Sequence, residues 1–167
     1  LNAGAQMGPV SFVGHLGTEG KGIKFLSDLY TTSWQPSALW VNSDGNRFAN
    51  EDVAFSFSQA ANAIYAQHGH YAWSIFDDSQ VKYMMDKGID SGIGVLAPVG
   101  KKLPNLQKDI DEALAADSDN FKAADSVEQL AKEIGVPETN LAAAVSAYNK
   151  GCEVQHDGQF FKLKNYM

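Results

Sequence analysis

The sequence contains very few of the residues from which disulfides, zinc sites and anion clamps are built. Cys152 is the only cysteine in 167 residues, so no disulfide can form within the chain, and the four scattered histidines offer no zinc-binding spacing. Arg47 is the only arginine, although guanidinium is the usual group for bidentate recognition of carboxylate or phosphate. We therefore expect no metal site and few anchors for an anionic ligand.

Basic charge is scarce as well. The 13 Lys and Arg residues are outnumbered by 20 Asp and Glu residues, which gives a net charge of −7. Such a surface repels phosphate groups, whereas nucleic-acid binding depends on basic patches. The composition therefore argues against a nucleic-acid partner.

Long apolar runs are missing too. No stretch approaches the roughly 20 apolar residues that a membrane-spanning helix needs, and no charged-then-apolar leader precedes a small-residue cleavage site. We expect no transmembrane segment. The chain begins at Leu1 rather than at a methionine, and we expect it to be an excised piece of a longer protein.

The residues that are present are typical of one globular domain, with 44% hydrophobic and 11% aromatic residues. Apolar spacing and turn residues predict helices over residues 54–67, from Asp77 or Asp78 to 87, 109–116, 127–134 and 137 to about 150, with another beginning near Gly20. Short strands are predicted at residues 10–13, 71–76 and 121–124, the second of them half-buried, and a β-hairpin near residues 38–50, where Asp44-Gly45 separates two apolar runs. Separated strands and helices without an internal repeat indicate a small mixed α+β domain.

Three patterns carry weak functional signals. The glycines within residues 14–17 and 20–22 lack the Gly-x-Gly-x-x-Gly spacing of a dinucleotide-binding loop, and we interpret them as shaping a loop before a helix. His68 and His70 lie two residues apart in a predicted turn, which is poor geometry for one shared ligand. Asp77-Asp78 resembles a pair of catalytic carboxylates, but adjacent acids before a helix are usually its cap and first-turn residues.

The most specific stretch is Asn42–Glu51, which joins a hairpin turn to Arg47 and Glu51. On a strand, a spacing of four residues puts both side chains on one face, where they could pair or share a neighbour. Composition and spacing alone favour a structural ion pair that fixes the hairpin.

Five segments resemble a known family. Residues 39–51, Leu-Trp-Val-Asn-Ser-Asp-Gly-Asn-Arg-Phe-Ala-Asn-Glu, resemble the V-N-x-x-G-x-R-F-x-N-E segment of the fumarate reductase and succinate dehydrogenase flavoprotein family. Four further resemblances follow the family's order: a glycine loop at 17–24, a strand at 71–77, paired helices over 126–149 that end in Tyr-Asn, and a Cys-to-Lys segment at 152–162. Together they cover nearly the whole chain.

The resemblance implies that the chain is the capping, or substrate, domain of an FAD-dependent oxidoreductase of bacterial type, present as a fragment. Residues 1–29 would be the edge of the FAD-binding domain and residues 30–167 the capping domain. FAD would then be bound mainly by a domain of the same polypeptide outside this chain. In the family the cap closes over flavin and a small-molecule substrate for hydride transfer to or from an activated C–C double bond. The isolated chain is expected to be catalytically inactive.

The resemblance also implies roles for individual residues. The family-motif positions expected to be structural are Asn42, Gly45, Arg47, Phe48, Asn50 and Glu51. The residues expected near the cofactor are Gly17, Glu19 and Gly20.

Two departures from the family pattern bear on the substrate. Fumarate reductases carry a proton-donating arginine soon after R-F-x-N-E, and Phe55 stands at about that place. They also carry a histidine before the hairpin that helps to hold a substrate carboxylate, whereas residues 30–35 contain Trp34 and no histidine. We therefore expect a substrate other than fumarate or succinate, larger or more apolar. Candidate pocket residues are Trp34, Phe55 and Ser56, although aromatic side chains are more commonly part of a core.

The alternative interpretation is a non-catalytic binding or interaction module whose glycine-rich first segment packs on a partner. A cap cut from a flavoprotein should leave residues 1–29 poorly supported and an apolar face exposed. An independent module should bury both.

Overall fold

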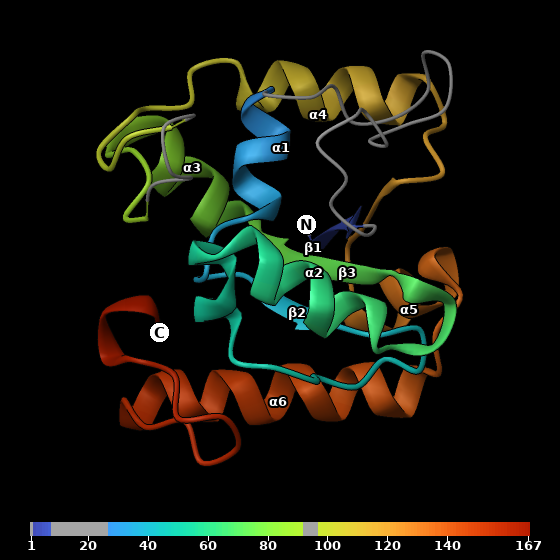
Figure 1. The fold of residues 1–167 in the computed structure, drawn as a ribbon. Coiled ribbons are helices and arrows are strands. Elements are labelled where there is room, and N and C mark those ends of the chain that lie inside the picture. Colours follow the sequence, from blue (N-terminus) through green and yellow to red (C-terminus); the bar gives the residue numbers. More distant parts are fainter. Residues whose placement is uncertain (1, 8–26, 92–96) are drawn as a thin grey trace.

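A four-stranded antiparallel sheet lies at the centre of the molecule in the computed structural model, which describes residues 2–7, 27–91 and 97–167 (Figure 1). The strands follow the order β2 (Leu39–Val41), β3 (Ala72–Asp77), β1 (Asn2–Met7) and β4 (Phe121–Ala124), and each neighbouring pair is antiparallel. Within the described residues six α-helices accompany the sheet: α1 (Asp28–Ser33), α2 (Phe57–Tyr65), α3 (Asp78–Asp86), α4 (Leu106–Ala115), α5 (Val127–Ile134) and α6 (Glu138–Val154). Three short 3₁₀ helices complete the described elements: η1 (Glu51–Phe55), η2 (His68–His70) and η3 (Lys164–Tyr166). The fold is α+β, as predicted.

The sheet separates two apolar clusters. Because successive side chains of a strand point to opposite faces, Ala72 and Phe76 of β3 join one cluster and Trp73 and Ile75 join the other. Helices α1, α2, α3 and α4 cover the first face, and α5 and α6 cover the second. In Figure 1 α4 and α6 run along opposite edges of the molecule.

The predicted half-burial of β3 is wrong, because its first five residues are all buried. The paired helices α5 and α6 cover the face that was expected to meet solvent, and they do so with apolar residues such as Leu130 and Leu141. The strand itself, at residues 72–77, agrees with the prediction to within a residue.

Several local predictions are confirmed. Asp77 caps α3 in a reciprocal capping box with Gln80, rather than serving as a carboxylate pair with Asp78. Gly135 ends α5 in the left-handed conformation (φ 72°). The predicted bounds of β4 and α5 match the structure, whereas α6 continues to Val154, beyond the predicted end near Lys150.

The predicted β-hairpin forms with a return strand that is very short. A tight turn does form: Gly45 has φ +75°, and the Asn42 amide donates to the Asn46 carbonyl at 2.9 Å. The return strand, however, is reduced to one bridge between Val41 and Arg47, and β2 pairs with β3 instead. The chain then turns away, because the Asn50 side chain accepts the Asp52 amide and starts η1. The helix predicted from residue 54 accordingly begins at residue 57.

Part of the prediction lies outside the described residues: the strand at 10–13, the start of a helix near Gly20, and the cofactor-proximal candidates Gly17, Glu19 and Gly20. The division between residues 29 and 30 remains a prediction. The sheet crosses that division, because β1 pairs with both β3 and β4.

Candidate functional site

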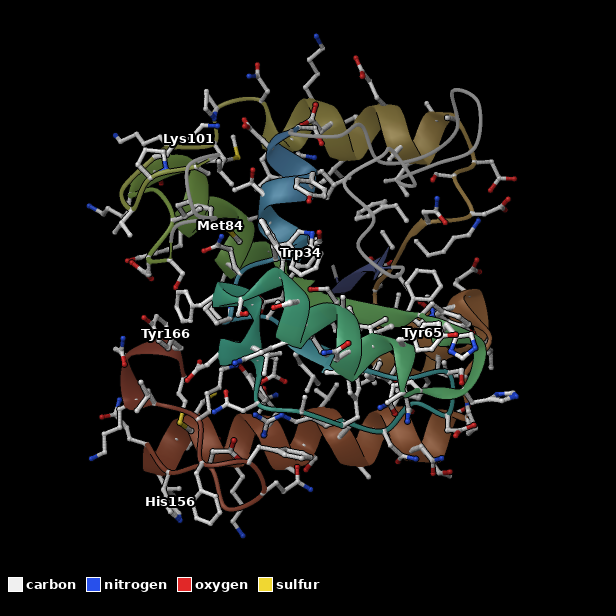
Figure 2. All side chains as sticks on the ribbon, viewed as in Figure 1. Trp34, Tyr65, Met84, Lys101, His156 and Tyr166 are labelled. Atoms are coloured by element: carbon white, nitrogen blue, oxygen red, sulfur yellow. The ribbon has the colours of Figure 1, made fainter. Side chains whose placement is uncertain are left out.

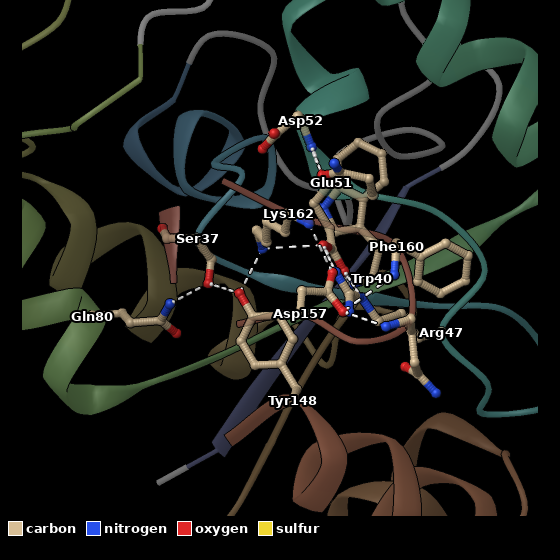
Figure 3. A network of polar contacts seen from close by, with 12 residues as sticks. Ser37, Trp40, Arg47, Glu51, Asp52, Gln80, Tyr148, Asp157, Phe160 and Lys162 are labelled. Atoms are coloured by element: carbon tan, nitrogen blue, oxygen red, sulfur yellow. Dashed lines mark hydrogen bonds and ion pairs between the residues drawn. The ribbon is translucent and has the colours of Figure 1, made fainter. Parts of the chain in front are cut away.

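A buried network of charged side chains surrounds Arg47 (Figure 3). The guanidinium donates to Glu51 through Nε (2.8 Å to Oε1) and Nη2 (2.7 Å to Oε2), and Nη2 also donates to Asp157 Oδ2 at 2.8 Å. The side chains are 4%, 0% and 5% exposed, respectively. The ion pair expected from the sequence therefore forms, although Glu51 lies at the start of a 3₁₀ helix rather than on a strand.

The network continues toward the other end of the chain. Lys162 Nζ lies 3.0 Å from Glu51 Oε2 and donates to the Tyr148 hydroxyl at 2.6 Å. That hydroxyl donates to the Ser37 carbonyl at 2.9 Å, which also accepts from Gln80 Nε2 at 2.8 Å. The contacts thus connect the 3₁₀ helix η1, the helix α6, the loop before β2 and the helix α3.

Local backbone structure places each acid of the network. Asn50 caps η1 and so fixes its first residue, Glu51, whose Oε1 also accepts the Trp40 amide at 3.2 Å. Asp157 follows the end of α6 and accepts amides from the turn after it, including that of Lys162 at 3.1 Å. Because that turn is wound around the Asp157 carboxylate, the C-terminal segment is fixed to the Arg47 pair.

Two aromatic rings enclose the guanidinium. Its Cζ lies 5.2 Å from the centroid of Tyr148 and 5.0 Å from that of Phe160. Cation–π contacts of this kind add attraction where water is excluded. Arg47 is therefore held by two carboxylates and two rings.

The charges of the network balance one another. Burial disfavours the charged guanidinium, but hydrogen bonds and attraction to Glu51 and Asp157 outweigh it and raise the pKa of Arg47. Burial likewise acts against the Asp157 carboxylate, yet the hydrogen bonds from Arg47 and from backbone amides hold its pKa below the usual range. Burial lowers the pKa of Lys162 and raises that of Tyr148. Two cations thus meet two anions, and the arrangement is suited to holding structure together rather than to binding an external anion.

The three candidate pocket residues do not come together around one cavity. Trp34 is 3% exposed and packs edge-on against Trp40 and Phe57, with ring centroids 5.7 and 5.5 Å apart. Phe55 is 51% exposed, and Ser56 lies beside it with its hydroxyl 3.2 Å from that of Ser58. Figure 2 shows Trp34 in the interior near α1. Trp34 is a core residue, whereas Phe55 is at the surface.

Sequence reasoning missed how Arg47 meets Asp157 and Lys162. Asp157 was noted as part of a resemblance, but 110 residues separate it from Arg47. A lone arginine and a distant acid carry no local pattern that would indicate a pair. Tyr148 lies on the helix predicted from residue 137, and its ring packs against the second apolar cluster while its hydroxyl joins the network.

A half-open depression lies between α3, β3 and α6. Its volume is about 600 Å³, and its lining includes Leu39 and Ile75 from the sheet together with the carboxylates of Asp77 and Asp90. None of the described residues that line it is basic. In the part of the chain that the structure describes there is no cluster of His, Cys, Asp or Glu that could hold a metal ion.

His68 and His70 are both exposed, in agreement with a solvated turn. The His70 ring stacks on Tyr65 at 4.2 Å between centroids. Among residues 2–7, 27–91 and 97–167, no helix is long and apolar enough to cross a membrane.

Each of the relatives reported below is named as a reductase. The vinyl phenol reductase of Lactiplantibacillus plantarum is 33% identical over 141 residues, which are 84% of this chain and 28% of that protein. A Shewanella frigidimarina protein named as a probable fumarate reductase is 33% identical over 147 residues, or 87% of this chain and 20% of its own length. The open conformation of a flavocytochrome c3 fumarate reductase superposes with a TM-score of 0.57 and 26% identity over 96% of this chain and 21% of that one.

The chain is homologous to a segment of fumarate reductase-like flavoproteins. No family model matches it. It spans between a fifth and about a quarter of the fumarate reductase-like proteins it matches, so most of their length has no counterpart here. The resemblance inferred from five short segments is confirmed.

Proposed function

We propose that this chain is the capping, or substrate, domain of an FAD-dependent oxidoreductase that transfers hydride to or from an activated C–C double bond. The proposal is supported by 33% identity to two reductases along most of this chain, combined with a match to only 28% and 20% of their lengths. A segment of this size is typical of one domain within a larger enzyme. Its partners would be the FAD-binding domain of the same polypeptide and a small-molecule substrate.

The described residues do not fit FAD on their own. Dinucleotide sites hold the pyrophosphate with a glycine-rich turn, a helix N-terminus or basic side chains. The depression between α3 and α6 carries negative rather than positive charge, because its described lining includes the carboxylates of Asp77 and Asp90 and no basic side chain. We propose that FAD is bound mainly outside this chain, with Gly17, Glu19 and Gly20 as candidates to approach it. What this chain supplies is a rigid lid that excludes water from the substrate.

The state of Arg47 is the observation that carries the substrate proposal. The lone arginine is buried and paired with Glu51 and Asp157, so it is not available to a substrate carboxylate. Phe55, the last residue of η1, presents an exposed ring at about the place where a fumarate reductase would carry its proton-donating arginine. We propose a substrate that is an uncharged or apolar alkene rather than a dicarboxylate. The name of the vinyl phenol reductase relative agrees with such a substrate.

Reoxidation of the full-length protein tests this proposal. The flavin would be photoreduced without air, and its visible absorbance would be followed after adding fumarate or 4-vinylphenol. We expect rapid reoxidation by the uncharged alkene and little by fumarate. Rapid reoxidation by fumarate would contradict the substrate proposal, and a full-length protein that holds no flavin would contradict the proposed function as a whole.

A titration of the isolated chain with FAD tests whether the flavin is bound mainly outside this chain. We expect no change in flavin absorbance or fluorescence and no reductase activity. Tight binding that left a yellow protein would show that these 167 residues hold a complete flavin site.

A further inference from the structure

A partly exposed aromatic pair lies beside the buried network, with Phe55 exposed and Tyr166 half-buried. The rings of Phe55 and Tyr166 are 5.3 Å apart between centroids and tilted by 53°. Phe55 is 51% exposed, and Leu163 nearby is 58% exposed. We call the surface formed by these three residues the Phe55–Tyr166 face. It joins η1 to the C-terminal segment, which are more than a hundred residues apart in sequence.

The buried network holds the Phe55–Tyr166 face in place. Glu51 is the first residue of the 3₁₀ helix that Phe55 ends, and Lys162 directly precedes Leu163. Lys162 Nζ lies 3.0 Å from Glu51 Oε2, and this ion pair therefore ties the two segments that carry the face to each other. The Tyr166 amide also donates to the Leu163 carbonyl at 3.0 Å, which closes the turn that carries the ring. A partly exposed pair built on such support is pre-organised for contact with a ligand.

The charge near this face does not favour an anion. Lys162 is neutralised by Glu51, and Asp52, in the same 3₁₀ helix as Phe55, adds a carboxyl group. Burial raises the pKa of Asp52, against opposing effects that include attraction to Lys162. Lys164 is exposed, but it lies two residues before Tyr166 in a 3₁₀ turn, so the two side chains leave the axis about 120° apart. The face is thus apolar and aromatic, with one phenol hydroxyl.

Resting on the proposed function, we propose that the Phe55–Tyr166 face binds the aromatic ring of an uncharged substrate. Aromatic rings prefer tilted or edge-to-face neighbours with centroids 4.5–7 Å apart, and a third ring can add to this pair in the same way. The Tyr166 hydroxyl forms no hydrogen bond within the described residues, and it can donate to or accept from a phenol hydroxyl. Phe55 and Tyr166 are then residues that determine specificity, with Phe55 selecting the ring and Tyr166 its polar substituent.

Ligand binding to the full-length, oxidised protein tests the assignment without relying on turnover. The probes are 4-ethylphenol, which has no reducible side-chain double bond, and succinate, each titrated by calorimetry. We expect the wild type to bind 4-ethylphenol more tightly than succinate. Phe55→Arg should weaken 4-ethylphenol at least about tenfold and strengthen succinate, and Tyr166→Phe should weaken 4-ethylphenol about three- to tenfold.

Matched controls separate this face from general damage. Val99→Arg adds the same charge at another exposed position, Tyr83→Phe removes a hydroxyl elsewhere, and Lys164→Ala removes the nearest exposed cation. These three variants should bind 4-ethylphenol as the wild type does. The assignment is overturned if Phe55→Arg, folded by circular dichroism, leaves 4-ethylphenol binding unchanged, or if the wild type prefers succinate. Ring binding that is lost in Phe55→Arg, in a wild type that reduces no alkene, would support this face and overturn the proposed function.

Discussion

The two halves of one short segment differ in what they do. Residues 47–51 turn their charged side chains inward, where Arg47 and Glu51 meet the C-terminal segment. Residues 52–56 follow directly, and Phe55 turns its ring outward. The comparison teaches that the part of the motif most easily seen in a sequence maintains the fold, whereas the position that we propose to distinguish substrates lies four residues after it.

Removing the central acid should have the largest effect on stability. Glu51→Ala leaves Arg47 and Lys162 as buried cations with fewer partners and takes the acceptor from the Trp40 amide. Breaking a buried ion pair by removing one partner costs about 3–5 kcal/mol. We expect a loss of that size in the free energy of unfolding, measured by urea with tryptophan fluorescence.

Asp44 provides the matched control for this change, because it is an exposed acid in the turn at Asn42–Asn46, seven residues before Glu51. Asp44→Ala should alter the free energy of unfolding by no more than about 0.5 kcal/mol. Equal losses in the two variants would mean that the inward-facing half is not the structural one.

Replacing Lys162 should lower the free energy of unfolding by less, because Glu51 keeps its ion pair with Arg47. Lys162→Met keeps the length of the side chain and removes the costly burial of an ammonium group, but it leaves the Tyr148 hydroxyl without its donor. We expect a loss of about 1–3 kcal/mol. In a double-mutant cycle with Glu51→Gln, the two losses should be clearly non-additive. Additive losses would contradict direct coupling between η1 and the C-terminal segment.

Acid should weaken the inward-facing half through Asp157. The pKa of this carboxyl is lower in the folded chain than its unfolded value of about 3.9, so its contribution to stability is complete above pH 4 and is lost as the pH falls below that value. The difference in urea midpoint between the wild type and Asp157→Asn should therefore shrink as the pH is lowered from 5 to 2. A difference that stays constant over this range would rule out the Arg47–Asp157 contact as its source.

The smallest effect on stability is expected in the outward-facing half. Phe55→Ala removes an exposed ring that contacts the ring of Tyr166, so the free energy of unfolding should fall by about 0.5 kcal/mol or less. Trp34→Ala is its buried counterpart and should cost about 3–5 kcal/mol. A large loss in Phe55→Ala would place this ring in the core and contradict the comparison.

Much of the fold could be predicted because its signals are local. The cap at Asp77, the glycine that ends α5 at Gly135 and the bounds of β4 all depend on residues within a few positions of one another. The strand order and the short return from the turn at Asn42–Asn46 could not be predicted, because they depend on which distant segments compete for β2.

In the candidate site, too, contacts between nearby residues were predictable and contacts between distant segments were not. The pairing of Arg47 with Glu51 was predictable from a spacing of four residues, whereas the contact with Asp157 depends on the path of the chain after α6. The core position of Trp34 also follows from packing between distant segments, chiefly against Trp40 and Phe57. Its candidacy for a pocket rested on its aromatic character and on its place before the turn, where the resemblance implies a substrate-binding histidine.

The most direct test uses the fact that Arg47 is the only arginine of the chain. In a ¹H–¹⁵N spectrum of the 167-residue chain, a single Nε–H signal reports its guanidinium. Our account predicts a signal that exchanges slowly with water near pH 8, shifts strongly in Glu51→Gln, and does not move when succinate is added. A rapidly exchanging signal at the position of a free arginine, or one that succinate shifts, would contradict the claim that this residue holds the fold and does not bind the substrate.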